Sequence, residues 1–202
     1  TVKVLGLIKK NQPQTWDTFL RTANKADTEV IIKKEKIFTL AEYHFGKNYR
    51  YVVAPLHPKY CIHPIYQWGQ AVDLKVDPVP LLNMSVSELK AAIKKLKFLK
   101  TIRSNKAPII LDASYGMQVE PYSNLDADLI KERANLVTSN EKFSQNILTA
   151  LRENAEEKAQ FDSQEDLLAE ETIYKKFTPQ KDTALFPKWH AASWKDKLIL
   201  LD

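Results

Sequence analysis

The sequence predicts an α+β protein in which a basic, strand-rich part precedes an acidic, helical part. β-Branched and aromatic residues concentrate between residues 29 and 111, whereas apolar residues recur at helical spacing after Pro121. Charge divides in the same way. Residues 1–111 hold 19 Lys and Arg against 8 Asp and Glu, and residues 112–202 hold 11 against 17. We expect the boundary near residues 120–140, with the first part facing a polyanion and the second supporting it.

Two short helices are predicted at the start of the chain. Apolar residues recur at three-residue intervals from Val2 to Lys10, and Pro13 ends the pattern. Residues 14–24 then place Trp16 and Phe19 on one side of a second helix. The first residue is not methionine and no signal-peptide pattern follows, so we expect the chain to be a fragment of a longer protein.

Strands are predicted from residue 29 onwards. Residues 29–40, EVIIKKEKIFTL, alternate in part and are rich in β-branched side chains, which predicts a pair of strands. Tyr49–Leu56 and Ile65–Leu74 predict further strands, and residues 107–112 predict a short buried one.

Helical signals begin at Ser85, which forms a capping box with Glu88 before an amphipathic helix. Lys90, Lys94 and Lys97 share one face of that helix, where a solvated surface is the ordinary explanation and a membrane surface an alternative. Three helices follow Pro121. Another is expected to begin at Thr178-Pro179, where a cap residue precedes a first-turn proline.

Several classes of protein are disfavoured by composition. No apolar run approaches the roughly 18 residues that cross a bilayer, so we expect a soluble protein without a membrane partner. The single cysteine, Cys61, fits a reducing cytoplasm. The chain has only four glycines and no glycine-rich phosphate-binding loop. His57, Cys61 and His63 lie close in sequence but lack a fourth zinc ligand, which favours a plain surface loop over a metal site. No catalytic constellation is present in this chain.

The segment Phe45–Pro58, FGKNYRYVVAPLHP, carries the strongest binding signal. Cations and aromatic rings alternate from Lys47 to Tyr51, immediately before an apolar strand. Cations neutralise phosphates and rings stack on bases, so this pattern predicts contact with a nucleic-acid strand. Packing between neighbouring strands is the alternative explanation of the rings.

A series of short motifs resembles the C-terminal two-thirds of bacterial exodeoxyribonuclease I, a processive 3′→5′ exonuclease of single-stranded DNA. The motifs, in chain order, are Gln12-Pro13, Val53-Ala54-Pro55-Leu56 with His57-Pro58, Val72-Asp73-Leu74, Pro80-Leu81-Leu82, Asn105-Lys106 with Pro108, Asn135-Leu136, and Ile173-Tyr174 with Phe177. The segment from His57 to Gly69 is longer than the family pattern.

The resemblance implies an SH3-like β-barrel domain with flanking helices, followed by an all-α domain. Residues 1–20 would be the last helix and linker of a nuclease domain, residues 21–135 the SH3-like domain, and residues 136–202 an incomplete helical domain. The family's Mg²⁺-binding carboxylates and catalytic histidine belong to the nuclease domain and have no counterparts here. We therefore expect this chain to need no cofactor, to be inactive by itself and to pack against that nuclease domain.

Single-stranded DNA is the partner that the resemblance implies, and the acidic C-terminal tail of single-stranded DNA-binding protein is a second one. The residues expected to contact DNA are Lys47, Asn48, Tyr49, Arg50, Tyr51, Arg103, Lys106, Tyr174 and Lys175. SH3-like folds serve many functions, so a protein–protein interaction module without nucleic-acid affinity stays open as the alternative.

Overall fold

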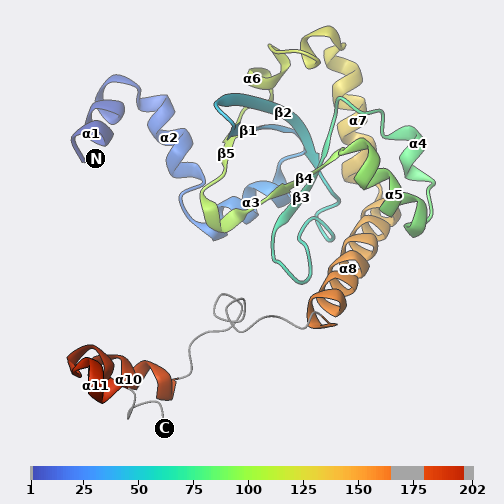
Figure 1. Cartoon of the computed structure of the whole chain (residues 1–202). Coiled ribbons are helices and arrows are strands. Elements are labelled where there is room, and N and C mark those ends of the chain that lie inside the picture. The colour runs from blue at the N-terminus through green and yellow to red at the C-terminus, as the bar shows by residue number, and fades with distance from the viewer. Residues whose placement is uncertain (1, 165–179, 198–202) are drawn as a thin grey trace. The chain divides into compact units, whose positions relative to one another are not determined.

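A five-stranded antiparallel sheet organises the first part of the chain, with strand order β4-β3-β2-β1-β5 (Figure 1). The computed structural model describes residues 2–164 and 180–197. The strands are β1 (Phe38–His44), β2 (Lys47–Pro55), β3 (Gly69–Asp73), β4 (Leu99–Ile102) and β5 (Ile109–Leu111). The helices are α1 (Val2–Asn11), α2 (Pro13–Arg21), α3 (Lys25–Lys34), α4 (Val79–Leu82), α5 (Val86–Leu96), α6 (Ala113–Met117), α7 (Ala127–Ser139), α8 (Glu141–Gln164), α10 (Gln180–Ala191) and α11 (Trp194–Lys197). The α+β class is confirmed.

The chain divides into two compact units, residues 1–158 and 159–202. The first unit contains the sheet, the helices up to α7 and most of α8. In the second unit, α10 and α11 are described. Within the described ranges, no helix is long and apolar enough to cross a membrane.

The sheet is not closed into the barrel that the sequence analysis predicts. Strands β4 and β5 are its two edges, and among the described residues no hydrogen-bonded pairing joins them. Both strands are short, and a 3-10 turn at Ser104–Lys106 separates them. Pro108, which has no backbone N–H to donate, then precedes β5. The β-barrel that the resemblance implies is therefore wrong for the described residues, which form an open sheet.

The predicted strand pair over residues 29–40 is wrong in its first half, because residues 25–34 form α3. Asn24 caps this helix, and its side chain accepts a hydrogen bond from the Asp27 backbone N–H at 2.9 Å. Thr28, Ile31 and Ile32 are buried at a spacing of three and four residues, which is one face of a helix. The cap and this packing outweigh the weak strand preference of the β-branched residues.

Other helix predictions are confirmed. α1 and α2 occupy the two segments expected at the start of the chain. The capping box before α5 is present: the Ser85 hydroxyl accepts from the Glu88 N–H, and the Glu88 carboxylate accepts from the Ser85 N–H at 2.7 Å. Lys97 ends α5 in the left-handed conformation, with φ 49°.

One hydrophobic core in the first unit joins the sheet to its helices. Phe38 and Val53 of the sheet are fully buried, and so are Ile130 of α7 and Phe143 of α8. By contrast, α2 buries no residue, and α1 leaves Val4 and Leu7 exposed. Helices α7 and α8 thus belong to the packing that holds the sheet in place.

Gly116 of α6 lies against the sheet where a side chain has no room. A Cβ atom there would be 2.5 Å from Val52 Cγ2 and 2.7 Å from Thr39 Oγ1. The Gly116 N–H also donates to that hydroxyl at 2.9 Å. This close approach fixes α6 on β1 and β2.

We predict that Gly116→Ala lowers the free energy of unfolding by about 1–3 kcal/mol, because α6 must shift to relieve the overlap. Urea unfolding followed by circular dichroism measures the change. Gly6→Ala is the control, since nothing lies within 4 Å of its added methyl group. Equal stability of Gly116→Ala and the parent would contradict this packing.

Candidate functional site

The first half of β2 extends beyond its neighbour β3. Strand β2 pairs with β1 from Lys47 to Val53, but β3 pairs only with the segment Val53–Pro55. Lys47–Arg50 are consequently exposed, although they belong to a regular strand. The two-residue turn before them, Phe45-Gly46, has positive φ at both positions, as in a type I′ hairpin. The predicted binding turn is therefore a hairpin tip with one unpaired edge.

Tyr49 and Tyr51 lie on the same face of β2 because they are two residues apart. Their rings are stacked, with centroids 6.1 Å apart and an interplanar angle of 2°. The Lys100 ammonium of β4 lies 3.5 Å from the Tyr51 ring centroid, in a cation–π contact. Burial, followed by the nearby carboxylates of Glu42 and Asp73, raises the pKa of Tyr51. The hairpin thus presents a fixed pair of parallel rings beside a cation.

A hollow of about 360 Å³ lies between this part of β2 and the segment Val119–Tyr122. Arg50 and Lys75 are the cations in its lining, and Glu120 is the carboxylate. The Arg50 guanidinium donates to the Tyr115 carbonyl oxygen at 3.4 Å, which directs it toward α6. The lining of the hollow thus carries two cations and one carboxylate.

The carboxylate of Asp73, at the end of β3, is fully buried beneath this surface. The Tyr122 hydroxyl donates to it at 2.5 Å, and the Lys75 and Lys100 ammonium groups lie 3.4 and 3.8 Å away. Burial raises the pKa of Tyr122, so this phenol stays a hydrogen-bond donor. Burial also lowers the pKa of Lys100 by more than the attraction of Asp73 raises it. Asp73 thus holds two cations in place near the ring pair.

A second hollow, of about 420 Å³, lies between β1, β4 and the turn after β4. Arg103 and Lys106, both predicted from the sequence, line it together with Lys100. Glu42 and His44 also line it and pair with each other at 3.1 Å. Lys100 thus lines this hollow and also contacts the Tyr51 ring.

The structure brings seven of the nine predicted DNA-contact residues to these two hollows and the hairpin. Lys47, Asn48, Tyr49, Arg50 and Tyr51 form the start of β2, and Arg103 and Lys106 follow β4. Tyr174 and Lys175 lie outside the described residues. Lys75 and Lys100 were not predicted from the sequence, since only the pairing of distant strands places them here. We call the surface formed by Arg50, Lys75, the ring pair, Lys100, Arg103 and Lys106 the basic strip.

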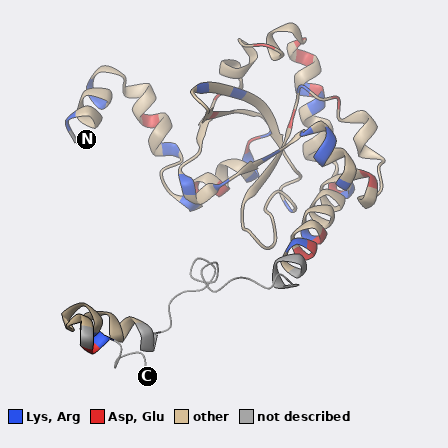
Figure 2. Ribbon diagram, in the orientation of Figure 1, with Lys and Arg blue, Asp and Glu red and all other residues tan. Residues whose placement is uncertain are grey.

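The lysine face of α5 is partly neutralised. The Lys90 ammonium lies 2.6 Å from the Glu157 carboxylate and 3.3 Å from that of Glu153, where α5 meets α8 (Figure 2). This pairing ties the basic helix to the acidic one. It supports the explanation of the lysine face of α5 as a solvated surface that is separate from the basic strip.

His57, Cys61 and His63 are not arranged as a metal site. Cys61 is buried with its thiol near the Pro58 carbonyl oxygen, and the His63 imidazole accepts backbone N–H groups of its own loop. In residues 2–164 and 180–197, no group of three or more His, Cys, Asp or Glu side chains is placed to hold a metal ion. The described residues thus offer no set of ligands for the Mg²⁺ ions that the resemblance implies for a nuclease domain.

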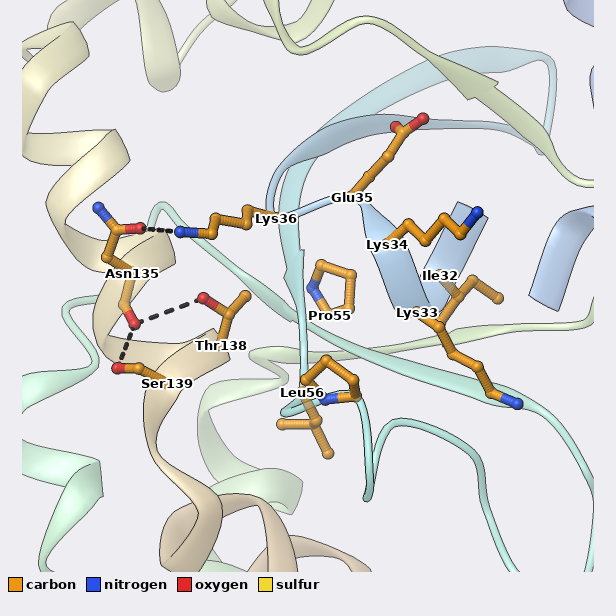
Figure 3. A pocket seen from close by; sticks show the side chains of 11 residues that line it. Ile32, Lys33, Lys34, Glu35, Lys36, Pro55, Leu56, Asn135, Thr138 and Ser139 are labelled. Atoms are coloured by element: carbon orange, nitrogen blue, oxygen red, sulfur yellow. Dashed lines mark hydrogen bonds between the residues drawn. The ribbon is translucent and has the colours of Figure 1, made fainter. Parts of the chain in front are cut away.

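A third hollow, of about 210 Å³, lies between α3, the end of β2 and α7 (Figure 3). Its apolar lining comes from Ile32, Pro55, Leu56 and Pro58, and its cations are Lys33, Lys34 and Lys36. The Lys36 ammonium donates to the Asn135 side chain at 3.4 Å. Glu35, the carboxylate of the lining, is already paired with Arg21. This hollow is therefore an apolar surface with a basic rim.

Comparisons with known proteins find the fold in Exonuclease I. No protein-family model and no curated protein sequence matches the chain. Among solved structures, E. coli Exonuclease I in complex with a 5cy-dT13 oligonucleotide matches with a TM-score of 0.64 and 18% identity, over 100% of this chain and 44% of that one. An ExoI/SSB-Ct complex matches with a TM-score of 0.63 and 17% identity, over 98% of this chain and 42% of that one.

A moderately thermophilic Exonuclease I from Methylocaldum szegediense gives a TM-score of 0.63 and 18% identity, over 98% of this chain and 42% of that one. This chain thus spans less than half the length of the structures that it matches. At such identity, the similarity shows a shared fold.

We predict that Tyr122→Phe lowers the free energy of unfolding by about 1.5–3 kcal/mol, since it removes a hydrogen bond to a buried carboxylate. Thermal and urea unfolding measure the change. Tyr60→Phe is the control, because the Tyr60 hydroxyl donates at 3.2 Å to the exposed Glu141. If both variants lose equally little stability, the hydrogen bond from Tyr122 does not stabilise the buried Asp73 carboxylate.

Proposed function

We propose that this chain is the DNA-gripping part of an exodeoxyribonuclease I-type 3′→5′ exonuclease and is inactive by itself. The observation that carries the proposal is the basic strip, in which the stacked Tyr49 and Tyr51 rings lie beside Lys100 and share a hollow with Arg50 and Lys75. Bases of a single strand stack on such rings, and its phosphates bind the flanking cations. Both interactions tolerate any sequence, as a processive enzyme requires.

The fold supports this proposal. The similar solved structures reported above are Exonuclease I, and E. coli Exonuclease I has also been solved in complex with single-stranded DNA. We propose that this chain belongs to the same family and that its open sheet corresponds to an SH3-like domain within residues 21–135. The helical residues 136–202 would follow it, and those up to residue 158 belong to the same compact unit as the sheet. Hydrolysis, with its Mg²⁺ ions, would belong to a nuclease domain that packs against residues 1–20.

Exposed apolar residues on α1 and α2 support such packing. Val4 and Leu7 of α1 are each 58% exposed, and Phe19 and Leu20 of α2 are 43% and 49% exposed. Burying these side chains against another domain would remove apolar surface from water.

We predict that labelled oligo-dT binds this chain with an affinity that falls about a hundredfold between 50 and 200 mM salt, because roughly five cations displace counterions from the strand. Fluorescence anisotropy measures the affinity. Tyr49→Ala/Arg50→Ala should abolish most of the binding, since it removes a stacking ring and a phosphate contact. We expect no hydrolysis of the oligonucleotide in Mg²⁺.

Lys59→Ala/Tyr60→Ala is the matched control, because it removes the same kinds of side chain from a site where Lys59 pairs with Glu141 at 2.8 Å. Absence of binding by the parent at low salt would overturn the proposal and favour the protein-interaction module. Hydrolysis that EDTA abolishes would contradict the assignment of catalysis to another domain.

We also propose that the third hollow receives the acidic C-terminal tail of single-stranded DNA-binding protein. Its basic rim complements acidic side chains, and its apolar lining suits an apolar terminal residue. An ExoI structure with an SSB-Ct is among the matches.

We predict that an acidic peptide with an apolar C-terminal residue binds this chain and that Lys33→Glu/Lys34→Glu weakens the binding at least tenfold, because the charge complementarity is reversed. Isothermal titration calorimetry provides the affinities. Lys94→Glu/Lys95→Glu on α5 is the control with the same change of charge. If the α5 variant weakens peptide binding as much, the net positive charge of the chain rather than this hollow attracts the peptide.

A further inference from the structure

The segment His57–Gly69, between β2 and β3, is held in one conformation by its own hydrogen bonds. The His63 N–H donates to the Trp68 carbonyl oxygen at 2.8 Å. The His63 imidazole is buried, and its Nδ1 accepts the Ile65 and Tyr66 N–H groups at 3.1 and 3.2 Å. These bonds fix the backbone from which the ring side chains of the segment project.

Those rings form a stack that ends on a cation. The rings of Tyr66 and Trp68 are stacked, with centroids 4.9 Å apart and an interplanar angle of 19°. The Arg103 guanidinium carbon lies 4.9 Å from the Trp68 ring centroid. Tyr66 is 42% exposed, and Arg103 is also exposed. Packing would explain a buried stack, but this one leaves ring surface and a guanidinium in contact with solvent.

A hollow of about 240 Å³ lies beside the stack. It is lined by His63, Tyr66, Trp68, Gln70, Thr101, Leu151, Asn154, Ala155 and Lys158. Lys158 brings a positive charge, Gln70 and Asn154 bring amide groups, and the lining contains no carboxylate. Flat apolar walls, amides and a cation suit a nucleobase and its phosphate.

This stack is continuous with the basic strip. Arg103 lines the hollow between β1 and β4 and also lies over Trp68. Thr101 of β4 lines both that hollow and the one beside the stack. Lys100, Thr101 and Arg103 thus connect the basic strip to the Tyr66–Trp68 rings along β4 and the turn after it.

We propose that Tyr66 and Trp68, with Arg103, form a second base-stacking contact for the same single strand, separate from the hairpin rings. This inference rests on the proposed function. It assigns a binding role to the segment His57–Gly69. The strand's footprint then covers both ring pairs, and affinity depends on the length of the oligonucleotide.

The test compares oligo-dT of about 5 and about 20 nucleotides, lengths that bracket the usual site sizes of single-strand binders. Trp68→Ala should weaken the long oligonucleotide about tenfold and leave the short one unchanged, provided that the short one occupies the hairpin. Trp16→Ala is the matched control, because Trp16 also lies under a cation, Lys9, at 6.0 Å, on α2. Equal affinities of parent and Trp68→Ala for the long oligonucleotide would overturn the inference but not the proposed function.

A second measurement does not depend on the stability of that variant. In Trp16→Phe/Trp189→Phe/Trp194→Phe, Trp68 is the sole tryptophan. Long oligo-dT should quench its fluorescence, whereas short oligo-dT should not. Unchanged fluorescence at saturating long oligo-dT would contradict a contact at Trp68. Failure of the parent to bind either length would instead defeat the proposed function itself.

Discussion

The buried carboxylate of Asp73 is the constraint on which the candidate site depends. It lies at the end of β3, where pairing with Val53 begins, and it accepts a short hydrogen bond from Tyr122. A buried charge is costly unless it is paired, so Lys75 and Lys100 must stay close to it. Lys100 in turn lies over the Tyr51 ring. One buried carboxylate thus orders cations from β4 and from the turn after β3, together with the rings of β2.

The confirmed helix predictions rest on residues that are close together in sequence. The Ser85–Glu88 capping box defined the start of α5, because both partners lie within one helical turn. Asn24 and Asp27 formed an equally local cap before α3, but the β-branched run after them suggested strands. The hairpin site was predictable from its own alternating residues. Lys75 and Lys100 were not, because their place depends on which strands pair.

Sheet closure was the other property that sequence patterns could not settle. Whether β4 and β5 meet depends on their lengths and on the turn between them. The stack of Tyr66 on Trp68 has the same character: the two residues are near in sequence, yet Arg103 reaches them only through β4. Both features arise from contacts between distant segments.

The unpaired edge of β2 has a consequence for solubility. A strand with free N–H and C=O groups can join a strand of another copy, and proteins commonly prevent this with charged side chains at the edge. Lys47 and Arg50 lie on the part of β2 that β3 does not cover. The cations suited to phosphate contact therefore also act as gatekeepers against self-association. Replacing either cation would therefore also alter how readily the chain aggregates.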